Sequence, residues 1–257
     1  MHSIMTFASS PAFLPMTESA PVIVWFRQDL RLRDNPALDA AARLGRPILP
    51  VFVLDDEHPG DWRMGAASRW WLHHSLRSLD ASLKGRLVLL RGDAQVMLPE
   101  LLQEVDANAV YWNRLYEPWA IARDTVIKKQ LLDASVEVKS FNGSLLFDPP
   151  NTNKADGTPY RVFTPFYRKG CLQNGIQPRR PLDRPSKLRL YETPTGLSVD
   201  ELGLLPTVNW YDEIGATWTP GEEGAKARLD AFLANGIGDY KDCLLYTSDA
   251  ADDSALV

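Results

Sequence analysis

The chain has 257 residues, of which 45% are hydrophobic and 24% charged, and its formal net charge is −5. This composition fits one α/β domain plus an extension, and the lack of a long apolar run excludes a membrane span. Its two cysteines, Cys171 and Cys243, exclude a disulfide framework or a zinc cluster and favour a cytoplasmic location. The acidic balance gives no sign of a DNA-binding stripe, so a DNA-binding face is expected elsewhere.

Short apolar runs alternate with amphipathic helices from Pro21 to Phe147. The five runs, at residues 22–26, 48–53, 87–90, 109–112 and 136–141, predict strands. Pro50 weakens the second prediction, and the fifth run is polar enough to be an edge. Alternation of strands and helices predicts an α/β fold, a Rossmann-like doubly wound five-stranded parallel sheet with the first strand at its centre.

Four helices are expected between the strands. Asn35 and Pro36 are typical of a helix start, and Gly45 of its end. Leucines at 72, 76, 79 and 83 share one face of a helix over residues 66–83. Residues 95–105 and 118–132 complete the set. Ligands of such sheets bind beyond the carboxyl ends of the strands, so the loops after the first, second and fourth strands matter most.

The pattern changes after residue 148. We expect an α/β domain over residues 21–148 and an interdomain connector over 149–217 that lies along a surface, because structureless loops of this length are rare inside compact domains. Within the connector, residues 154–170 are aromatic and basic. Residues 218–242 would begin a helical domain, with a helix that opens at residues 220–223, carries Ala225, Leu229 and Phe232 on one side and reaches Tyr240.

The loop after the first strand, Trp25 to Asn35, reads WFRQDLRLRDN. Its alternating arginines, aspartates and apolar residues are compatible with a salt-bridged loop or with a ligand site. It contains no glycine fingerprint for phosphate, which argues against a dehydrogenase of the simple Rossmann type.

These residues resemble the opening signature of the DNA photolyase/cryptochrome family. Further segments resemble that family in the same order: Val53-Leu54-Asp55, Arg69-Trp70-Trp71-Leu72 with Ser75-Leu76, Val110-Tyr111-Trp112-Asn113 with Glu117-Pro118 and Arg123-Asp124, Tyr160 to Phe166, and Trp218 with Pro220-Gly221-Glu222 and Tyr240. The resemblance covers Pro21 to Asp242. It implies an N-terminal domain that carries an antenna chromophore, a reduced folate or a deazaflavin, and a helical domain that carries FAD.

The resemblance also assigns residues. Asn113 and Glu117 become the first candidates for antenna-chromophore contacts, and Arg27, Asp55 and Met64 are weaker candidates for the same pocket. An amide and a carboxylate suit the polar edge of a pterin or deazaflavin. From the residues alone, Asn113 could equally be a turn residue, and Glu117 a charge at a helix N-terminus. Tyr240 matches a position that contacts the FAD phosphates, and no catalytic residue is expected in this chain.

Two other groups of residues receive structural interpretations. His73 and His74 are adjacent on a helix and do not face each other, so we expect surface or partly packed side chains and no metal site. Trp70 and Trp71 lie on the same helix and are expected in the core.

Both ends of the chain look unusual. Residues 1–20 are expected to be disordered or a mis-called start, with Met16 as a plausible true start. The string from Cys243 to Asp252 resembles a translated sequencing adapter, so residues 243–257 are expected to be non-native and disordered. We therefore expect a fragment that stops before most of the FAD site and is inactive alone.

Three functions remain open from the sequence. The first is the N-terminal part of a photolyase that repairs pyrimidine dimers, a monomer that meets damaged DNA through the missing C-terminal domain. The second is a cryptochrome-type photoreceptor with the same first domain. The third is a stand-alone nucleotide-binding module, against which the connector and the Tyr240 helix argue.

Overall fold

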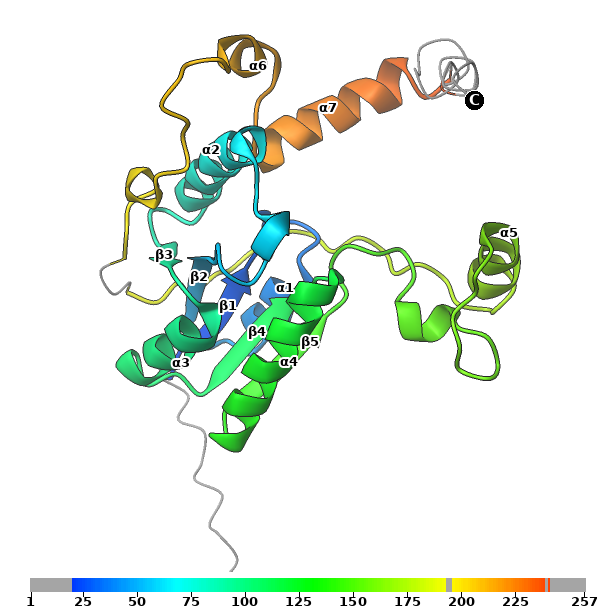
Figure 1. The fold of residues 1–257 in the computed structure, drawn as a ribbon, viewed down its shortest axis with the longest axis horizontal. Coiled ribbons are helices and arrows are strands. Elements are labelled where there is room, and N and C mark those ends of the chain that lie inside the picture. Colours follow the sequence, from blue (N-terminus) through cyan, green and yellow to red (C-terminus); the bar gives the residue numbers. More distant parts are fainter. Residues whose placement is uncertain (1–19, 193–195, 239, 241–257) are drawn as a thin grey trace, which may run out of the picture.

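The computed structural model describes residues 20–192, 196–238 and 240 (Figure 1). The α/β body comprises β1 (Val22–Phe26), α1 (Pro36–Arg43), β2 (Ile48–Leu54), α2 (Ala66–Ser82), β3 (Val88–Arg91), α3 (Ala94–Glu104), β4 (Ala109–Asn113), α4 (Pro118–Asp133) and β5 (Glu137–Phe141). The expectation for residues 1–20 lies outside the described residues except at Ala20, which is buried and accepts a hydrogen bond from Arg46. The expectation for the string after residue 242 lies outside them entirely.

The five strands form one parallel sheet in the order β3-β2-β1-β4-β5, with β1 at the centre and β5 at an edge. This confirms the predicted α/β class. One core lies between the sheet and α1 and α2, and includes Val24, Phe26, Leu38 and Leu76. The other lies against α3 and α4 and includes Trp25. Successive β1 side chains therefore enter opposite cores, because strand residues alternate between the faces of a sheet.

Pro50 does not interrupt β2, which extends through Leu54. The connector pairs with the start of this strand: the Ile48 N–H donates to Arg189 O over 2.7 Å, and the Tyr191 N–H donates to Ile48 O over 2.8 Å. Residues two apart in a strand direct their backbone N–H and C=O groups to the same side. The backbone of Pro50 therefore faces the side of β2 on which Ile48 meets the connector. Since β3 pairing begins only at Val51 opposite Val88, the missing proline N–H costs the β2–β3 ladder no bond.

Helix termini follow the predicted signals. The Asn35 side chain accepts the Leu38 N–H over 3.1 Å at the start of α1, and Gly45 adopts φ +68° after its end. The leucines at 72, 76 and 79 in α2 and the C-cap residue Leu83 are all buried, as their spacing predicts.

The tryptophan pair of α2 is split between core and solvent. Trp70 is 3% exposed, but Trp71 is 41% exposed, so the expectation of a core position is wrong for Trp71. Successive helical residues point about 100° apart, and the apolar face includes only one of the two. For the same geometric reason His73 is buried, against the expectation of a surface or partly packed side chain, while His74 is half-buried.

The segment after β5 first forms an arm and then returns to the body. The arm contains a 3-10 helix (Pro149–Thr152), α5 (Phe163–Pro165) and a π-helical turn (Phe166–Leu172), and it projects away from β5 and α4 (Figure 1). The returning chain crosses the sheet beside β2, and Val199, Leu202 and Leu204 complete the core under α2. The connector is thus extended along a surface for part of its length only.

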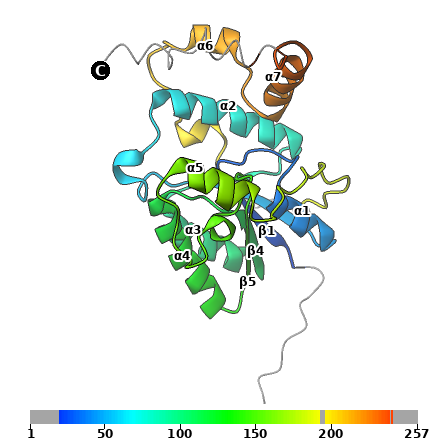
Figure 2. The same ribbon diagram turned by 90° about the vertical axis from the view of Figure 1, so that its right-hand side faces the viewer.

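Two further helices end the described chain. A 3-10 turn (Asp200–Leu202) leads to α6 (Asp212–Thr217) and α7 (Glu222–Asn235), and α7 begins beside α2 and then projects from the body (Figures 1 and 2). The expectation that this helix reaches Tyr240 is wrong, since α7 ends at Asn235. Leu229 and Phe232 are 55% and 39% exposed. Across the described part of the chain, none of the helices is long and apolar enough to cross a bilayer.

Candidate chromophore pocket

A cavity of about 990 Å³ lies at the carboxyl ends of β1, β2 and β4. This is the edge at which ligands of doubly wound sheets bind, and β1 and β4 flank the point where the strand order reverses. Helix α2 and the start of α7 close the other sides. The residues that line it include Trp25, Arg27, Gln28, Asp55, Trp62, Met64, Trp71, Glu117 and Arg123.

The floor of the pocket is a buried network of two cations and two carboxylates. Arg27 pairs with Asp124, and Arg123 contacts Asp124 over 2.9 Å and Asp55 over 3.3 Å. The two guanidinium side chains are each 4% exposed. They lie over the Trp25 ring, with Cζ atoms 4.8 and 4.9 Å from its centroid. Because the charges balance and each cation also faces a ring, the network offers a rigid base rather than a free ion.

The charge states of Arg27 and Asp55 in this floor depend on burial and on their hydrogen-bond and charge partners. Burial lowers the pKa of the Arg27 guanidinium, and the charge and hydrogen bond of Asp124 oppose that shift. Burial alone would raise the pKa of Asp55, but the backbone N–H groups of His58 and Glu57, with the charges of His58 and Arg123, hold it below its usual value. Asp55 therefore stays a carboxylate at neutral pH.

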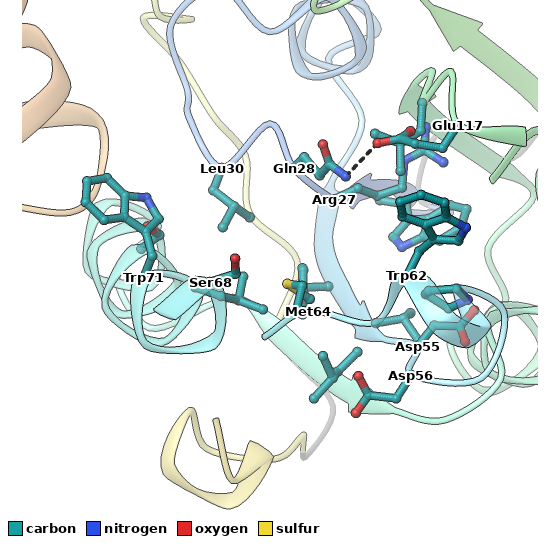
Figure 3. Close-up of a pocket in the computed structure, with 18 of the residues that line it drawn as sticks. Arg27, Gln28, Leu30, Asp55, Asp56, Trp62, Met64, Ser68, Trp71 and Glu117 are labelled. Atoms are coloured by element: carbon teal, nitrogen blue, oxygen red, sulfur yellow. Dashed lines mark hydrogen bonds between the residues drawn. The ribbon is translucent and has the colours of Figure 1, made fainter. Parts of the chain in front are cut away.

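One wall of the pocket is polar. The Gln28 side-chain amide donates to Glu117 Oε1 over 3.1 Å, shown as the dashed line in Figure 3. Glu117 is the N-cap residue of α4, where a negative charge is favoured by the helix dipole. Its second oxygen accepts the Tyr116 N–H over 3.1 Å. The pair therefore presents an amide and a carboxylate, held in place by main chain, to whatever enters the cavity.

The remaining walls are formed by two tryptophan rings and the thioether of a methionine. Trp62 and Trp71 lie on opposite sides of the cavity with Met64 between them (Figure 3). Trp62 is 83% exposed, so its ring is free to contact a ligand in the cavity. Flat apolar walls around one carboxylate–amide pair suit a planar heteroaromatic ligand with hydrogen-bonding groups along one edge.

Four of the five sequence candidates for the antenna site line this cavity: Arg27, Asp55, Met64 and Glu117. Asn113 does not. It is 3% exposed, its amide donates to Asp29 and, over 2.8 Å, to Asn35 Oδ1, and its Oδ1 accepts the Ala37 N–H over 3.1 Å. The expectation that Asn113 faces the pocket is therefore wrong.

Asn113 instead joins the end of β4 to the loop after β1 and to the start of α1. The last residue of β4 directs its side chain toward the α1 side of the sheet, where Gly143 passes so closely that a β-carbon there would lie 2.6 Å from Asn113 Cγ. Tyr240, the candidate for FAD contact, is 53% exposed, packs against the Phe232 ring and does not line the pocket.

Sequence reasoning missed several pocket residues. Gln28 lies inside the loop motif and was not singled out, Trp62 lies between the motifs, and Trp71 was assigned to the core. The sequence contains these residues but does not show their roles, because a tryptophan in the core and one in a pocket cannot be told apart from residue type alone. Only the fold brings the loop after β2 and the first turns of α2 to face the β4–α4 junction.

His58 joins two acidic residues beside the pocket. Its Nδ1 lies 2.8 Å from Asp55 and 3.7 Å from Asp93, and its Nε2 lies 2.7 Å from the Gln95 amide. Both ring nitrogens thus have hydrogen-bond partners from the protein. The grouping is accounted for as a hydrogen-bonded support for the loop after β2.

The chain matches the DNA photolyase family profile over residues 22–186. It belongs to that family. It is 42% identical to a deoxyribodipyrimidine photo-lyase of Agrobacterium fabrum over 88% of this chain and 47% of the relative. It is also 38% identical to Cryptochrome-1 of Arabidopsis thaliana over 65% of this chain and 25% of the relative.

Solved structures agree with the sequence relatives. A bacterial class III photolyase from Agrobacterium tumefaciens superposes with a TM-score of 0.80 and 40% identity, over 90% of this chain and 48% of that one. An archaeal photolyase from Sulfolobus tokodaii, described with two FAD molecules and a novel light-harvesting cofactor, gives a TM-score of 0.61 and 26% identity, over 72% of this chain and 42% of that one. The chain spans about half the length of the photolyase relatives it matches.

Proposed function

We propose that this chain supplies the antenna-chromophore part of a light-dependent deoxyribodipyrimidine photo-lyase, which repairs cyclobutane pyrimidine dimers in DNA. The observation that carries the proposal is the pocket at the strand ends, with ring walls from Trp62 and Trp71 and a carboxylate–amide pair from Glu117 and Gln28. The photo-lyase relative at 42% identity supports the repair activity over the other functions of the family.

The pocket residues fit an antenna of the reduced-folate or deazaflavin class. Both classes are flat heteroaromatics with donors and acceptors along one edge, which Glu117 and Gln28 can meet, while Trp62, Met64 and Trp71 cover the faces. Such a group, when bound, supplies absorption of light and passes on the excitation energy. The protein's part is to orient the rings and to exclude water from them.

Tyr240, the residue assigned to FAD contact by the resemblance, is 53% exposed and does not line the pocket. We therefore assign the flavin and the lesion chemistry to the part of the relatives' length that this chain does not span. On this proposal the chain, given FAD and blue light, leaves thymine dimers intact, and dimer reversal by the chain alone would contradict the assignment.

Chromophore binding is tested by titrating the purified chain with a reduced folate and with a deazaflavin, followed by absorbance and fluorescence. Glu117→Gln and Trp62→Ala are each expected to weaken binding roughly tenfold, the size of one charged hydrogen bond or one buried aromatic contact. The matched controls are Glu100→Gln on α3 and Trp210→Ala, which are exposed and outside the pocket. Equal binding by Glu117→Gln and wild type would contradict the site.

A cryptochrome-type photoreceptor is the second candidate, supported by the 38% identity to Cryptochrome-1 of Arabidopsis thaliana. The same pocket would serve both functions. Dimer repair by the product of the complete source gene separates them, since a photoreceptor would bind the chromophore in the same way and leave the dimers in place.

A further inference from the structure

The connector contains a concentration of positive charge that the rest of the chain lacks. Residues 154–190 include nine lysines and arginines and two aspartates, a net charge of +7 in a chain whose total is −5. The remaining residues therefore carry −12. Such asymmetry within one chain is typical of a segment that meets an anionic partner while the rest repels it.

The arm presents several of these charges without neutralising partners. Arg161, Arg168 and Lys169 are exposed, and no ion pair is found for their side chains among the described residues. The acidic residue of the arm, Asp156, is already engaged: it accepts the Thr158 N–H and hydroxyl over 2.9 and 2.6 Å and lies 4.0 Å from Lys154.

The arm has its own packing, which holds this surface in place. Tyr160 contacts the Phe166 ring, and Gly170 fits so tightly that a β-carbon there would lie 2.8 Å from Thr152 O. Phe163 and Tyr167 stack at 5.7 Å with an interplanar angle of 7°, yet Phe163 stays 72% exposed. Figure 1 shows the arm reaching out from the body beyond β5, where a large partner can approach it.

We propose that this arm binds the phosphate backbone of duplex DNA. Its cations are spread along the segment and do not converge on a pocket, which fits a polymer with repeated charges better than a single small anion. The exposed Phe163–Tyr167 stack adds an apolar surface for sugar edges beside the cations. This inference rests on the proposed function, which makes DNA the partner. It gives the chain a DNA-binding surface of its own although the net charge of the whole chain is negative.

The test is fluorescence anisotropy of a labelled, undamaged 20-base-pair duplex titrated with the whole chain at 50 to 200 mM salt. Arg161→Gln with Arg168→Gln is expected to weaken binding by tenfold or more at 0.1 M salt and to reduce the slope of log K against log salt by about two, since each phosphate contact contributes about 0.9. The control pair, Lys84→Gln with Lys128→Gln, removes the same charge from exposed positions on the body and should change affinity less than twofold.

Duplex binding that falls in the arm variant and persists in the control supports the proposal. Absence of binding at 50 mM salt, or equal losses in the arm and control variants, would overturn it and leave the arm as a packing surface for another polypeptide. Chromophore titration of the same arm variant keeps the two ideas separate. Lost DNA binding with unchanged chromophore binding supports the arm as a DNA contact independently of the pocket. Chromophore binding by the pocket variants equal to that of wild type would contradict the proposed function and leave the DNA result to decide the arm.

Discussion

Between β1 and β5 most apolar side chains pack into two cores, whereas after residue 160 many of them face solvent. Leu76 and Leu98 in the body are fully buried, while Leu172, Leu229 and Leu233 are at least half exposed. Both regions form helices, so local propensity does not separate them. The difference shows that the sheet and its helices bury most of their apolar side chains against one another, whereas the later helices leave theirs largely uncovered by the described residues.

The largest expected effect is on matched leucines of the two regions. Leu76→Ala on α2 should lower the free energy of unfolding by about 2–5 kcal/mol, because it leaves a cavity in a filled core. Leu229→Ala on α7 should change it by less than about 0.5 kcal/mol, since that side chain is 55% exposed. Urea unfolding followed by far-UV circular dichroism measures both, and equal effects would abolish the distinction between the regions.

Asn113→Ala sharpens the comparison inside the body. The substitution leaves the Ala37 N–H without its partner and removes one hydrogen bond each from the Asn35 and Asp29 oxygens, so the free energy of unfolding should fall by about 1–3 kcal/mol. Chromophore affinity in the protein that remains folded should stay within about twofold, because the side chain does not line the pocket. A large loss of affinity at unchanged stability would restore Asn113 to the binding site.

His73 on α2 lies beside Asp200 on the connector, and it should make the free energy of unfolding depend on pH. Burial, with the charges of Arg77 and His74, lowers the pKa of His73 in the folded chain, and Asp200 on the connector opposes them weakly. The unfolded chain then binds the extra proton first, so stability is complete above about pH 6.5 and falls as the pH drops below it, by at most about 1.4 kcal/mol per pH unit.

The difference between wild type and His73→Gln isolates this contribution from that of other groups. The free energy of unfolding of wild type minus that of the variant should decrease from pH 8 to pH 5, because the variant has no proton to take up at this position. A difference that stays constant over the range would show that His73 does not titrate between the two states.

The smallest expected effect belongs to the arm. Phe163→Ala removes a ring that is 72% exposed, so thermal unfolding of the body should shift by less than about 1 °C. Differential scanning fluorimetry checks this, with Phe26→Ala as the buried counterpart. A shift for Phe163→Ala approaching that of Phe26→Ala would mean that the arm and the body unfold as one unit.

The sequence by itself determined the sheet. Apolar runs of strand length, the Asn35-Pro36 start and the four leucines at 72, 76, 79 and 83 act through local geometry, which is why their positions hold to within a residue or two. The family resemblance, rather than these local patterns, supplied Arg27, Asp55, Met64 and Glu117 as candidates. Arg27, Asp55 and Glu117 line the pocket because they follow strands whose carboxyl ends share one edge of the sheet.

Only the tertiary structure decided which neighbours those residues meet. Trp70 and Trp71 are adjacent in α2, yet Trp70 is buried in the core and Trp71 lines the pocket. Asn113 is the last residue of β4, whose carboxyl end borders the pocket, but its side chain points toward the start of α1. Pro50 is tolerated because β3 pairs with β2 only from Val51 onward, while the connector, more than a hundred residues later, pairs with Ile48 at the start of the strand. Side-chain direction and long-range pairing depend on packing between distant segments, and no local pattern contains them.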